Sequence, residues 1–251
     1  MDLSRRQLLK ASGVTLAATA AGPWAAALPA RAATPKRGGE FRFRGYTPPH
    51  FDPHLTASYT TMINLSFTHS RLLKHKTGPS VKPGTFELEG DLAESWQQPN
   101  ETTYVFRLRK GVRWHRKPPL DGRELTAEDV RYTFDRFTTI KGNANRHLMN
   151  SLAKVEAVDA HTVMFTLKEP NAWFLDFLAD PMALCIVARE AVEKFGDLKK
   201  PEAVIGTGPW MLEDHQSKVK TTFVRNPDYF LKGLPYIDRV EGIDFPDPAA
   251  R

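Results

Sequence analysis

The sequence predicts a mixed α/β fold, and two neighbouring stretches of the 251-residue chain carry this prediction. Residues 103–108 alternate along the chain in the period-two pattern of a half-buried strand. Further on, Thr126 stands three residues before Asp129, the spacing of a capping box at a helix start. Residues 130–137 repeat apolar side chains at helical spacing, so one helix face is expected in the core. The apolar positions are Tyr104, Phe106 and Leu108 in the strand and Val130, Phe134 and Phe137 in the helix.

The composition is that of a soluble globular protein, with 41% hydrophobic and 25% charged residues. The formal net charge is +6, and residues 1–32 contribute +3 of it through four basic residues and one acid. In the remainder, Lys and Arg are interspersed with Asp and Glu, as on a solvated surface. Because there is no basic tract and no recognised nucleic-acid-binding motif, nucleic-acid binding is not expected.

Residue types used in catalysis and metal binding do not form a recognisable site. The single cysteine, Cys185, lies in an apolar run and is expected to be a buried, inert thiol. His50 and His54 have the spacing of a helical metal pair, but Pro53 lies between them and prevents a continuous helix. The sequence contains no G-x-S-x-G or H-E-x-x-H motif. We therefore expect no metal, no cofactor and no enzymatic activity.

Residues 1–32 have the features of a cleaved export signal. Basic residues in Ser4–Lys10 precede a weakly apolar stretch and a small-residue cleavage site that ends at Ala32. The SRRQLLK motif resembles the twin-arginine signal, which exports folded proteins; an ordinary secretory signal with two arginines is the alternative. No cysteine follows the apolar stretch, so a lipoprotein anchor is not expected. The mature chain is expected to be free in the periplasm and not to span a membrane.

After this signal, the sequence predicts a strand, a rigid loop and a helix. Glu40–Arg44 alternates and should form a strand with Phe41 and Phe43 facing inward. A proline-pinned loop over 45–54 follows, and residues 59–69 place apolar side chains at helical spacing. A short strand over 71–74 and a turn-rich connector over 76–84 come next.

The later part of the chain predicts a hairpin, two helices and two strands. These are a hairpin over 155–167, helices over 171–178 and 188–195, and strands over 219–224 and 236–245. The loop Gly206–Trp210 contains two glycines, but no Lys-Ser/Thr pair follows it and the next element is a strand. A phosphate-binding P-loop is therefore excluded.

Five motifs give a more specific indication than periodicity. They are LAESW at 92–96, FRLRKGVRWH at 106–115, DGRELTAEDV at 121–130, GTGPW at 206–210 and RNPDY at 225–229. In wording and order the chain resembles the solute-binding receptors of peptide- and nickel-type ABC importers. The stretch RKPPL at 116–120 departs from the family pattern and is interpreted as a loop insertion. The resemblance covers residues 38–251 but only the front part of the longer family members.

The resemblance implies a periplasmic binding protein type II-like fold. The chain would hold the first lobe only, as two mixed-sheet subdomains, with the second lobe missing. The first subdomain would combine residues 33–80 with the returning segment 203–251, which ends at the hinge crossing. The second subdomain would span residues 81–202. The sequence is therefore expected to be truncated relative to the family.

The resemblance also implies a monomeric periplasmic receptor that captures peptides or similar small solutes. Such a receptor closes around its ligand by a hinge motion and delivers it to the permease subunits of an ABC importer. The ligand stays open between a dipeptide, an oligopeptide, a nickel complex and another solute. The alternative is a truncated fragment that does not transport, because a ligand held by one wall stays largely solvated.

By position along the chain, the resemblance places ligand-binding residues in three segments. They are Ala57, Ser58 and Tyr59 after the proline-pinned loop, Thr207, Gly208 and Pro209 across from them, and Arg146 and His147 from the second subdomain. From the residue types alone, Ser58 and Tyr59 could equally be a helix N-cap and a packed aromatic residue.

Overall fold

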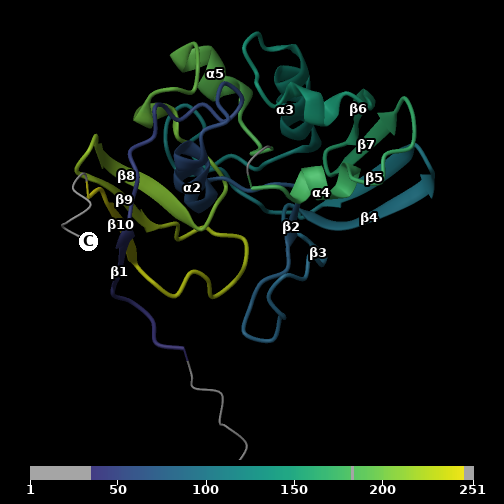
Figure 1. Ribbon diagram of the computed structural model, residues 1–251. Helices are drawn as coiled ribbons and strands as arrows, with labels where there is room; N and C mark the ends of the chain where they lie inside the picture. The colour runs from purple at the N-terminus through teal and green to yellow at the C-terminus, as the bar shows by residue number, and fades with distance from the viewer. Residues whose placement is uncertain (1–34, 182–183, 246–251) are drawn as a thin grey trace, which may run out of the picture. The chain divides into compact units, whose positions relative to one another are not determined.

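The fold is described from a computed structural model, which places residues 35–181 and 184–245. The predicted signal at residues 1–32 lies outside these residues. From Arg37 onward the chain forms one compact unit. Its elements follow in the order β1 (Glu40–Arg44), α2 (Tyr59–Thr68), β2 (Leu73–His75), β3 (Leu88–Gly90), β4 (Ala93–Asn100), β5 (Thr103–Leu108), α3 (Ala127–Thr139), η1 (Arg146–Met149), β6 (Leu152–Asp159), β7 (Thr162–Leu167), α4 (Phe174–Ala179), α5 (Arg189–Phe195), η2 (Pro201–Ala203), β8 (Trp210–Gln216), β9 (Lys220–Arg225) and β10 (Arg239–Ile243) (Figure 1).

One sheet joins the first strand to the last three, in the order β1-β10-β9-β8. We call it the terminal sheet. β1 runs parallel to β10, with Glu40 opposite Arg239 and Arg44 opposite Ile243, whereas the other pairs are antiparallel. This sheet is mixed, as predicted. Two segments that are distant in the sequence, residues 40–44 and 210–243, therefore build one layer.

The prediction that both phenylalanines of β1 face inward is wrong for Phe41. Phe43 packs partly buried against the core, with its ring 5.5 Å from the ring of Phe67 on α2. Phe41 is 50% exposed and stacks on Phe43 at 6.2 Å. β1 is an edge strand of the terminal sheet. Phe41 comes two residues before Phe43 on this strand and so lies further from the Phe67 ring.

A second sheet, which we call the central sheet, has the order β4-β5-β7-β6. All its pairs are antiparallel, so the prediction of a mixed sheet is wrong for this subdomain. The reason is local: β4–β5 and β6–β7 are hairpins closed by short turns, which an antiparallel pair permits. β2 and β3 form a separate two-stranded sheet.

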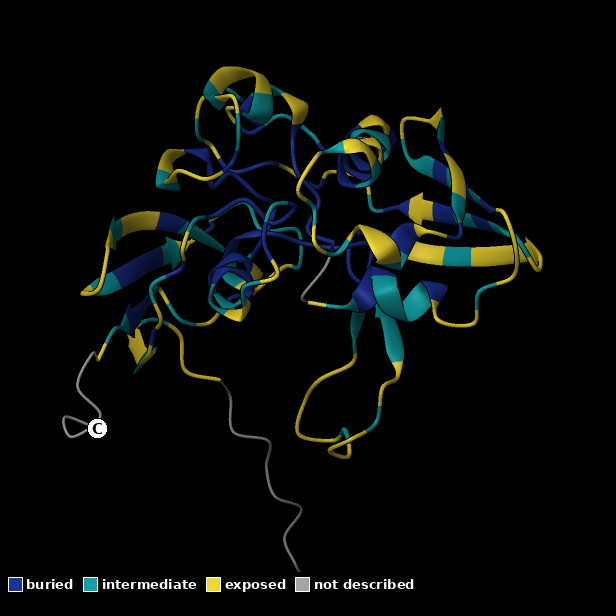
Figure 2. Cartoon of the chain, turned by 45° about the horizontal axis from the view of Figure 1, so that its top comes forward, coloured by how far each residue is buried: buried dark blue, intermediate teal, exposed yellow. Residues whose placement is uncertain are grey.

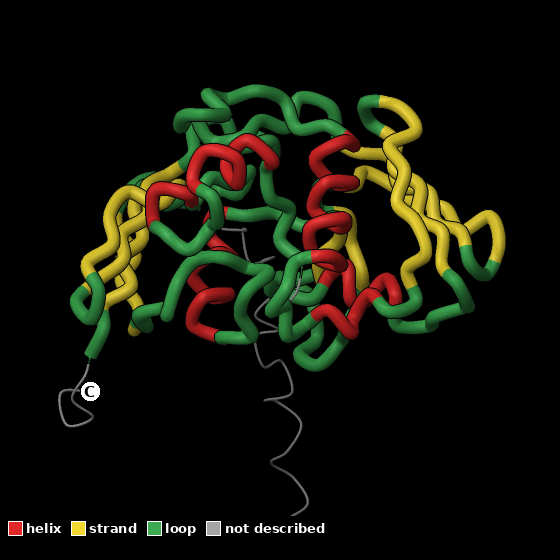
Figure 3. The backbone as a smooth tube through the Cα atoms, turned by 90° about the horizontal axis from the view of Figure 1, so that it is seen from above, coloured by secondary structure: helices red, strands yellow, loops and turns green. Residues whose placement is uncertain are grey.

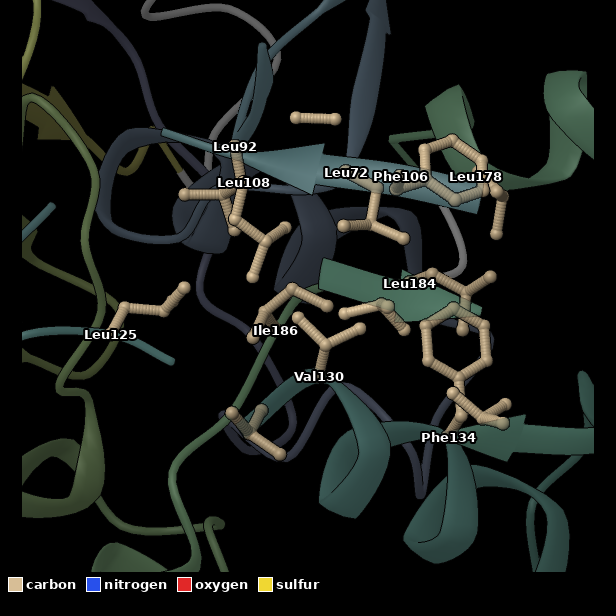
Figure 4. Close-up of a cluster of buried hydrophobic side chains, with 14 of the residues drawn as sticks. Leu72, Leu92, Phe106, Leu108, Leu125, Val130, Phe134, Leu178, Leu184 and Ile186 are labelled. Carbon is tan, nitrogen blue, oxygen red and sulfur yellow. The ribbon is translucent and has the colours of Figure 1, made fainter. Parts of the chain in front are cut away.

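α3 packs on the central sheet through the face that its sequence predicts. Val130, Phe134 and Phe137 are almost completely buried, and the Phe134 ring meets the Phe165 ring edge-on at 4.8 Å. Figure 4 shows Val130 and Phe134 pointing from the helix into a cluster of buried leucine, isoleucine and phenylalanine side chains. At the helix start, the Thr126 amide donates to the Asp129 carboxylate at 2.9 Å, as expected of a capping box.

A smaller core lies between α2 and the terminal sheet. Its buried members are Phe51, Met62, Leu65, Cys185, Val204, Leu212, Phe223 and Val240. Cys185 is a buried free thiol, so the predicted burial is confirmed. Figure 2 shows the buried residues concentrated where helices and strands meet, and Figure 3 shows α2 and α3 between the strands of the two sheets.

The shorter helices follow the sequence in type but not always in extent. α4 begins at Phe174, later than the predicted start at Asn171. α5 ends at Phe195, and the capping residue Gly196 has a positive φ of 80°, which glycine adopts readily. The predicted hairpin over 155–167 is confirmed by β6 and β7.

Candidate functional site

The loop over residues 45–58, between β1 and α2, is bonded to α2 at two points. The Asn64 side-chain amide donates to the Tyr46 carbonyl oxygen at 3.1 Å. The Thr61 hydroxyl donates to the His50 carbonyl oxygen at 2.7 Å. Because both donors are on α2, they fix the path of the loop into the helix start.

Ala57, Ser58 and Tyr59 lie together at this helix start. Ser58 occupies the N-cap position, but its hydroxyl bonds to the Thr60 hydroxyl at 2.8 Å instead of capping a helix amide. Ala57 is exposed, and Tyr59 is 65% exposed, so the interpretation of Tyr59 as a packed aromatic residue is wrong. The first amides of a helix have no partner within the helix. An exposed tyrosine beside them offers a ligand both an apolar face and a polar tip.

A buried ion pair ties the same loop to α3. The Arg136 guanidinium contacts both carboxylate oxygens of Asp52, at 2.5 and 3.1 Å. Burial opposes ionisation of Asp52, but the bonds from Arg136 outweigh it and hold the pKa of this carboxyl below its usual value. Arg136 also donates to Nδ1 of His54 at 2.8 Å. Burial, with Arg136 adding to it, lowers the pKa of His54 to about 3, so this imidazole stays neutral.

The Gly206–Pro209 loop lies against the far end of α2, and its two glycines are required sterically. A Cβ on Gly206 would stand 1.9 Å from the Thr68 carbonyl oxygen. A Cβ on Gly208 would stand 2.6 Å from the Thr68 carbonyl carbon. The Gly208 amide donates to the Thr68 carbonyl oxygen at 2.8 Å. This close backbone approach explains the two glycines without a phosphate ligand.

His115 bonds to this loop through both ring nitrogens. The Gly206 amide donates to Nδ1 at 3.2 Å, and Nε2 is 3.2 Å from the Gly208 carbonyl oxygen. An acceptor at Nδ1 and a donor at Nε2 describe one neutral tautomer. Burial lowers the pKa of His115 to about 4, which keeps this tautomer at neutral pH.

Asn226 holds the same loop from the other side. Its side-chain amide donates to the Gly208 carbonyl oxygen at 2.9 Å, and its backbone amide donates to the Pro209 carbonyl oxygen at 2.9 Å. Three of the matched motifs therefore meet here: those containing His115, Gly206 and Asn226. No role was predicted for His115 or Asn226 from the sequence, although the position of each within a matched motif was the available signal.

The structure does not bring Ala57–Tyr59 and Thr207–Pro209 together. The first segment lies at the start of α2 and the second packs on Thr68 at its end, about 14 Å away along the helix axis. Thr207 is 2% exposed and Gly208 is buried, whereas Pro209 is half-buried. A role for this loop in ligand binding stays a prediction.

Arg146 and His147 lie on the short helix η1 and are exposed. The loop just before η1 approaches the loop over residues 45–58, because a Cβ on Gly142 would stand 3.8 Å from the Leu55 side chain. Leu55 is two residues from Ala57. The structure therefore places the start of this loop near the first site segment, whereas Arg146 itself lines a hollow of about 160 Å³ beside α3 and β6.

Residues 35–181 and 184–245 contain neither a cluster of metal-ligating side chains nor a membrane-spanning helix. Within these ranges, no group of three or more His, Cys, Asp or Glu side chains is placed to hold a metal ion. No helix in the same ranges is both long and apolar enough to cross a membrane.

The comparison with protein families identifies the chain. Residues 87–251 match the model described as "Bacterial extracellular solute-binding proteins, family 5 Middle". The chain belongs to this family. It is 32% identical over 224 residues to the dipeptide-binding protein of Escherichia coli (strain K12), covering 82% of this chain and 40% of the relative. The chain thus spans about 40% of the length of the curated relatives it matches.

Solved structures of related proteins have the same fold. The periplasmic binding protein DppA from Helicobacter pylori, in complex with the peptide STSA, superposes with a TM-score of 0.74 at 27% identity, over 86% of this chain and 44% of that one. The binding protein MoaA from A. tumefaciens R10, in complex with mannopinic acid, gives 0.72 at 27% identity, over 86% and 42%. The type II periplasmic binding protein fold, of which this chain forms a partial lobe, is thereby confirmed.

Proposed function

We propose that the chain supplies one wall of the ligand site of a periplasmic ABC-importer receptor for peptides or similar small solutes. The observation that carries the proposal is the family match over residues 87–251, supported by relatives named for dipeptide binding. Delivery to a membrane permease is part of the proposal. So are the monomeric state and export by the twin-arginine route without a lipid anchor.

The proposed domain division follows the two sheets. The first subdomain combines residues 33–80 and 203–251, in keeping with a terminal sheet built from β1 and β8–β10. The second spans residues 81–202 and contains all four strands of the central sheet. A second lobe would supply the opposite wall of the cleft and close on it by a hinge motion.

On the first wall we place Ala57, Ser58 and Tyr59 in contact with the ligand. Their support is the exposure of Ala57 and Tyr59 at a helix start that the loop over residues 45–58 holds in place. Arg146 and His147 belong to the margin of this wall. Thr207, Gly208 and Pro209 also belong to the proposal, with Pro209 as the contact that reaches the surface, since the rest of their loop is buried and bonded internally.

The test is equilibrium titration of the folded chain with Ala-Phe, with a tetrapeptide and with mannopinic acid. We expect peptide binding that the Tyr59→Ala substitution weakens about tenfold, corresponding to about 1.4 kcal/mol of lost aromatic contact. Trp173→Ala is the matched control, since Trp173 is also an exposed aromatic residue but lies at the start of α4, outside the proposed ligand wall. It should leave the affinity unchanged.

The outcomes separate the proposal from its alternative. Micromolar binding of peptides by this chain alone would rule out the alternative of a fragment that does not bind or transport. Binding of mannopinic acid but of neither peptide would show that the solute class is wrong. A folded chain that binds none of the three would favour the non-transporting fragment.

A further inference from the structure

An apolar hollow of about 270 Å³ opens beside the Gly206–Pro209 loop. Its aromatic walls are Trp210, Tyr229 and Tyr236, and Leu234 lies at its rim. Leu234 and Tyr236 are each 39% exposed, so the apolar surface faces solvent. Lys74 is the charged side chain that lines it. Exposed aromatic and leucine side chains grouped in one hollow are typical of an interaction site.

A second hollow, of about 310 Å³, adjoins the first through a shared wall residue, Leu231. Its charged lining consists of Arg109, Lys110 and Glu94. The Nε atom of Arg109 donates to the Asp91 carbonyl oxygen at 2.8 Å, which fixes the direction of the guanidinium. The two hollows share the wall residue Leu231, and one is mainly apolar whereas the other is mainly charged. We treat the two together as one groove. We call it the Tyr236 groove.

The charge of the Tyr236 groove is positive. Three cations, Lys74, Arg109 and Lys110, line it against one carboxylate, that of Glu94. Among residues 35–181 and 184–245, Lys110 makes no ion pair, whereas Lys74 lies 3.4 Å from Glu89. Lys110 is therefore free to meet an acidic group on a partner.

The apolar part of the groove suits an uncharged side chain. Burial, with the Asp91 carboxylate adding to it, raises the pKa of Tyr229, so its phenol stays neutral and can donate a hydrogen bond. The Arg37 guanidinium lies 5.4 Å from the centre of the Tyr236 ring and covers part of its face. Rigid aromatic walls of this kind accept a flat or branched apolar side chain at low entropic cost.

The groove and the proposed ligand wall lie at opposite ends of the terminal sheet. Trp210 pairs with Arg225 beyond the Glu40–Arg239 end of the sheet. Ala57–Tyr59 follow the loop that leaves the sheet at Arg44. β1 spans about 13 Å between these ends. A molecule in the Tyr236 groove would therefore not occupy the ligand wall.

We propose that the Tyr236 groove docks an extended acidic segment of a partner protein. One apolar side chain of the segment lies between Trp210 and Tyr236, and the following carboxylates face Arg109 and Lys110. An extended segment matches two adjoining hollows that share Leu231. The apolar anchor supplies affinity, and the cations supply orientation and speed of association. This site is independent of the proposed ligand-binding function.

The test uses fluorescently labelled hexapeptides with blocked termini and measures anisotropy with the whole chain. The probe is Leu-Pro-Leu-Asp-Glu-Glu; one control replaces its acids with lysines, and the other replaces Leu-Pro-Leu with Ser-Gly-Ser. We expect the probe to bind at least about tenfold more tightly than either control. Raising the salt from about 20 mM to about 200 mM should weaken it, because the charged part is exposed.

Matched variants locate the binding. Lys110→Glu and Tyr236→Ala should each weaken probe binding by about fivefold or more. Lys141→Glu, a charge reversal at another exposed lysine, should not change it. All variants must keep the thermal unfolding midpoint of the parent chain, which is expected because the replaced side chains lie at the surface.

Four results would overturn the proposal. Equal binding of the probe and the lysine peptide would show that the cations of the groove do not contribute to binding. Equal loss in Lys141→Glu and Lys110→Glu would show non-specific charge attraction. Loss of probe binding in Tyr59→Ala, with Tyr236→Ala unaffected, would move the peptide to the ligand wall and would support the proposed receptor function instead. If sedimentation shows dimers that Tyr236→Ala dissociates, the occupant is a second copy and not an acidic partner.

Discussion

His115 is the residue on which the conformation of the Gly206–Pro209 loop most depends. Its imidazole accepts from the Gly206 amide and contacts the Gly208 carbonyl oxygen, an arrangement that only the neutral ring can make. Protonation would place a proton on Nδ1, opposite an amide that also carries one. The same burial keeps His54 and His69 neutral and lowers the pKa of each to about 3.

The lowered pKa of His115 predicts a loss of stability in acid. Its folded pKa is about 4 against an ordinary value of 6.5, so the unfolded chain binds the proton more readily between these values. The stabilisation is present above pH 6.5 and is lost as the pH falls towards 4. Between pH 7 and pH 5 His115 should account for about 2 kcal/mol of the decrease in unfolding free energy. Denaturant unfolding at a series of pH values measures it.

The control is His115→Gln. Glutamine cannot bond to both loop positions, so the variant should be less stable at pH 7 by about 1–3 kcal/mol. It should also show a shallower decrease between pH 7 and pH 5 than the parent chain. If both chains lose stability equally over this range, another group is responsible and the neutral-clamp interpretation of His115 is wrong.

Gly206 provides a steric prediction at the same loop. Gly206→Ala would place a methyl group 1.9 Å from the Thr68 carbonyl oxygen, where backbone has to move. We expect a loss of about 3 kcal/mol or more in unfolding free energy. Gly39→Ala is the comparison. Gly39 has a φ of +86°, but the space that an added Cβ would enter is open. It should cost about 1–2 kcal/mol through backbone strain alone.

These two alanine variants distinguish crowding from strain. A similar loss in both would mean that the Thr68 contact relaxes easily and that the loop is not locked against α2. A much larger loss at Gly206 would confirm that the close approach of the two backbones requires glycine.

Elements whose signals are local could be predicted from the sequence. The capping box of Thr126 and Asp129 and the apolar face of α3 depend on neighbouring residues only, and both are present. The direction of the central sheet's pairs and the exposure of Phe41 were missed, and the exposure of Tyr59 was left open. Each of these depends on which distant segment packs against the element, which periodicity does not encode.

The buried pair of Asp52 and Arg136 is a further long-range feature that no spacing reveals. It links the loop over residues 45–58 to α3, across more than eighty residues of sequence. Arg136→Met should destabilise the chain by about 3–5 kcal/mol, because it leaves the Asp52 carboxylate buried and unpaired. Unfolding in urea at neutral pH measures the change.

A double-mutant cycle separates the pair from its surroundings. Asp52→Asn combined with Arg136→Met removes both charges, and we expect the double variant to recover at least about 1 kcal/mol relative to Arg136→Met. Purely additive losses would show that the two side chains act independently. In that case the tie between the loop and α3 would come from the apolar contacts around it.

For the candidate site, the sequence could place each motif but not the distance between them. Ala57–Tyr59 and Thr207–Pro209 both lie beside α2, yet at opposite ends of it, because the Gly206–Pro209 loop packs on Thr68. That packing depends on His115 and Asn226, which come from two other parts of the chain. The matched motifs indicated a function shared with the family. Only the three-dimensional structure distinguishes the residues that support a loop from those that face solvent.

At the scale of the whole molecule, the two ends of the terminal sheet offer different surfaces. The end that leads from Arg44 to Tyr59 carries the proposed ligand wall, and the opposite end carries the Tyr236 groove. A receptor that holds a solute and meets a partner needs both surfaces free at once. Their separation by the length of β1 satisfies this requirement.

Export tests the function at the level of the whole chain. The twin-arginine prediction rests on Arg5 and Arg6 within SRRQLLK, and the alternative secretory route needs only positive charge there. Replacing both with lysine should therefore reduce the periplasmic amount by more than about tenfold and leave uncleaved protein in the cytoplasm. Lys10→Arg keeps the charge and should be exported normally.

Intact-mass measurement of the periplasmic form should give a chain that begins at Ala33. Normal export of the double-lysine variant would assign the chain to the ordinary secretory route. Absence of both the parent chain and this variant from the periplasm would contradict the proposal of a periplasmic receptor.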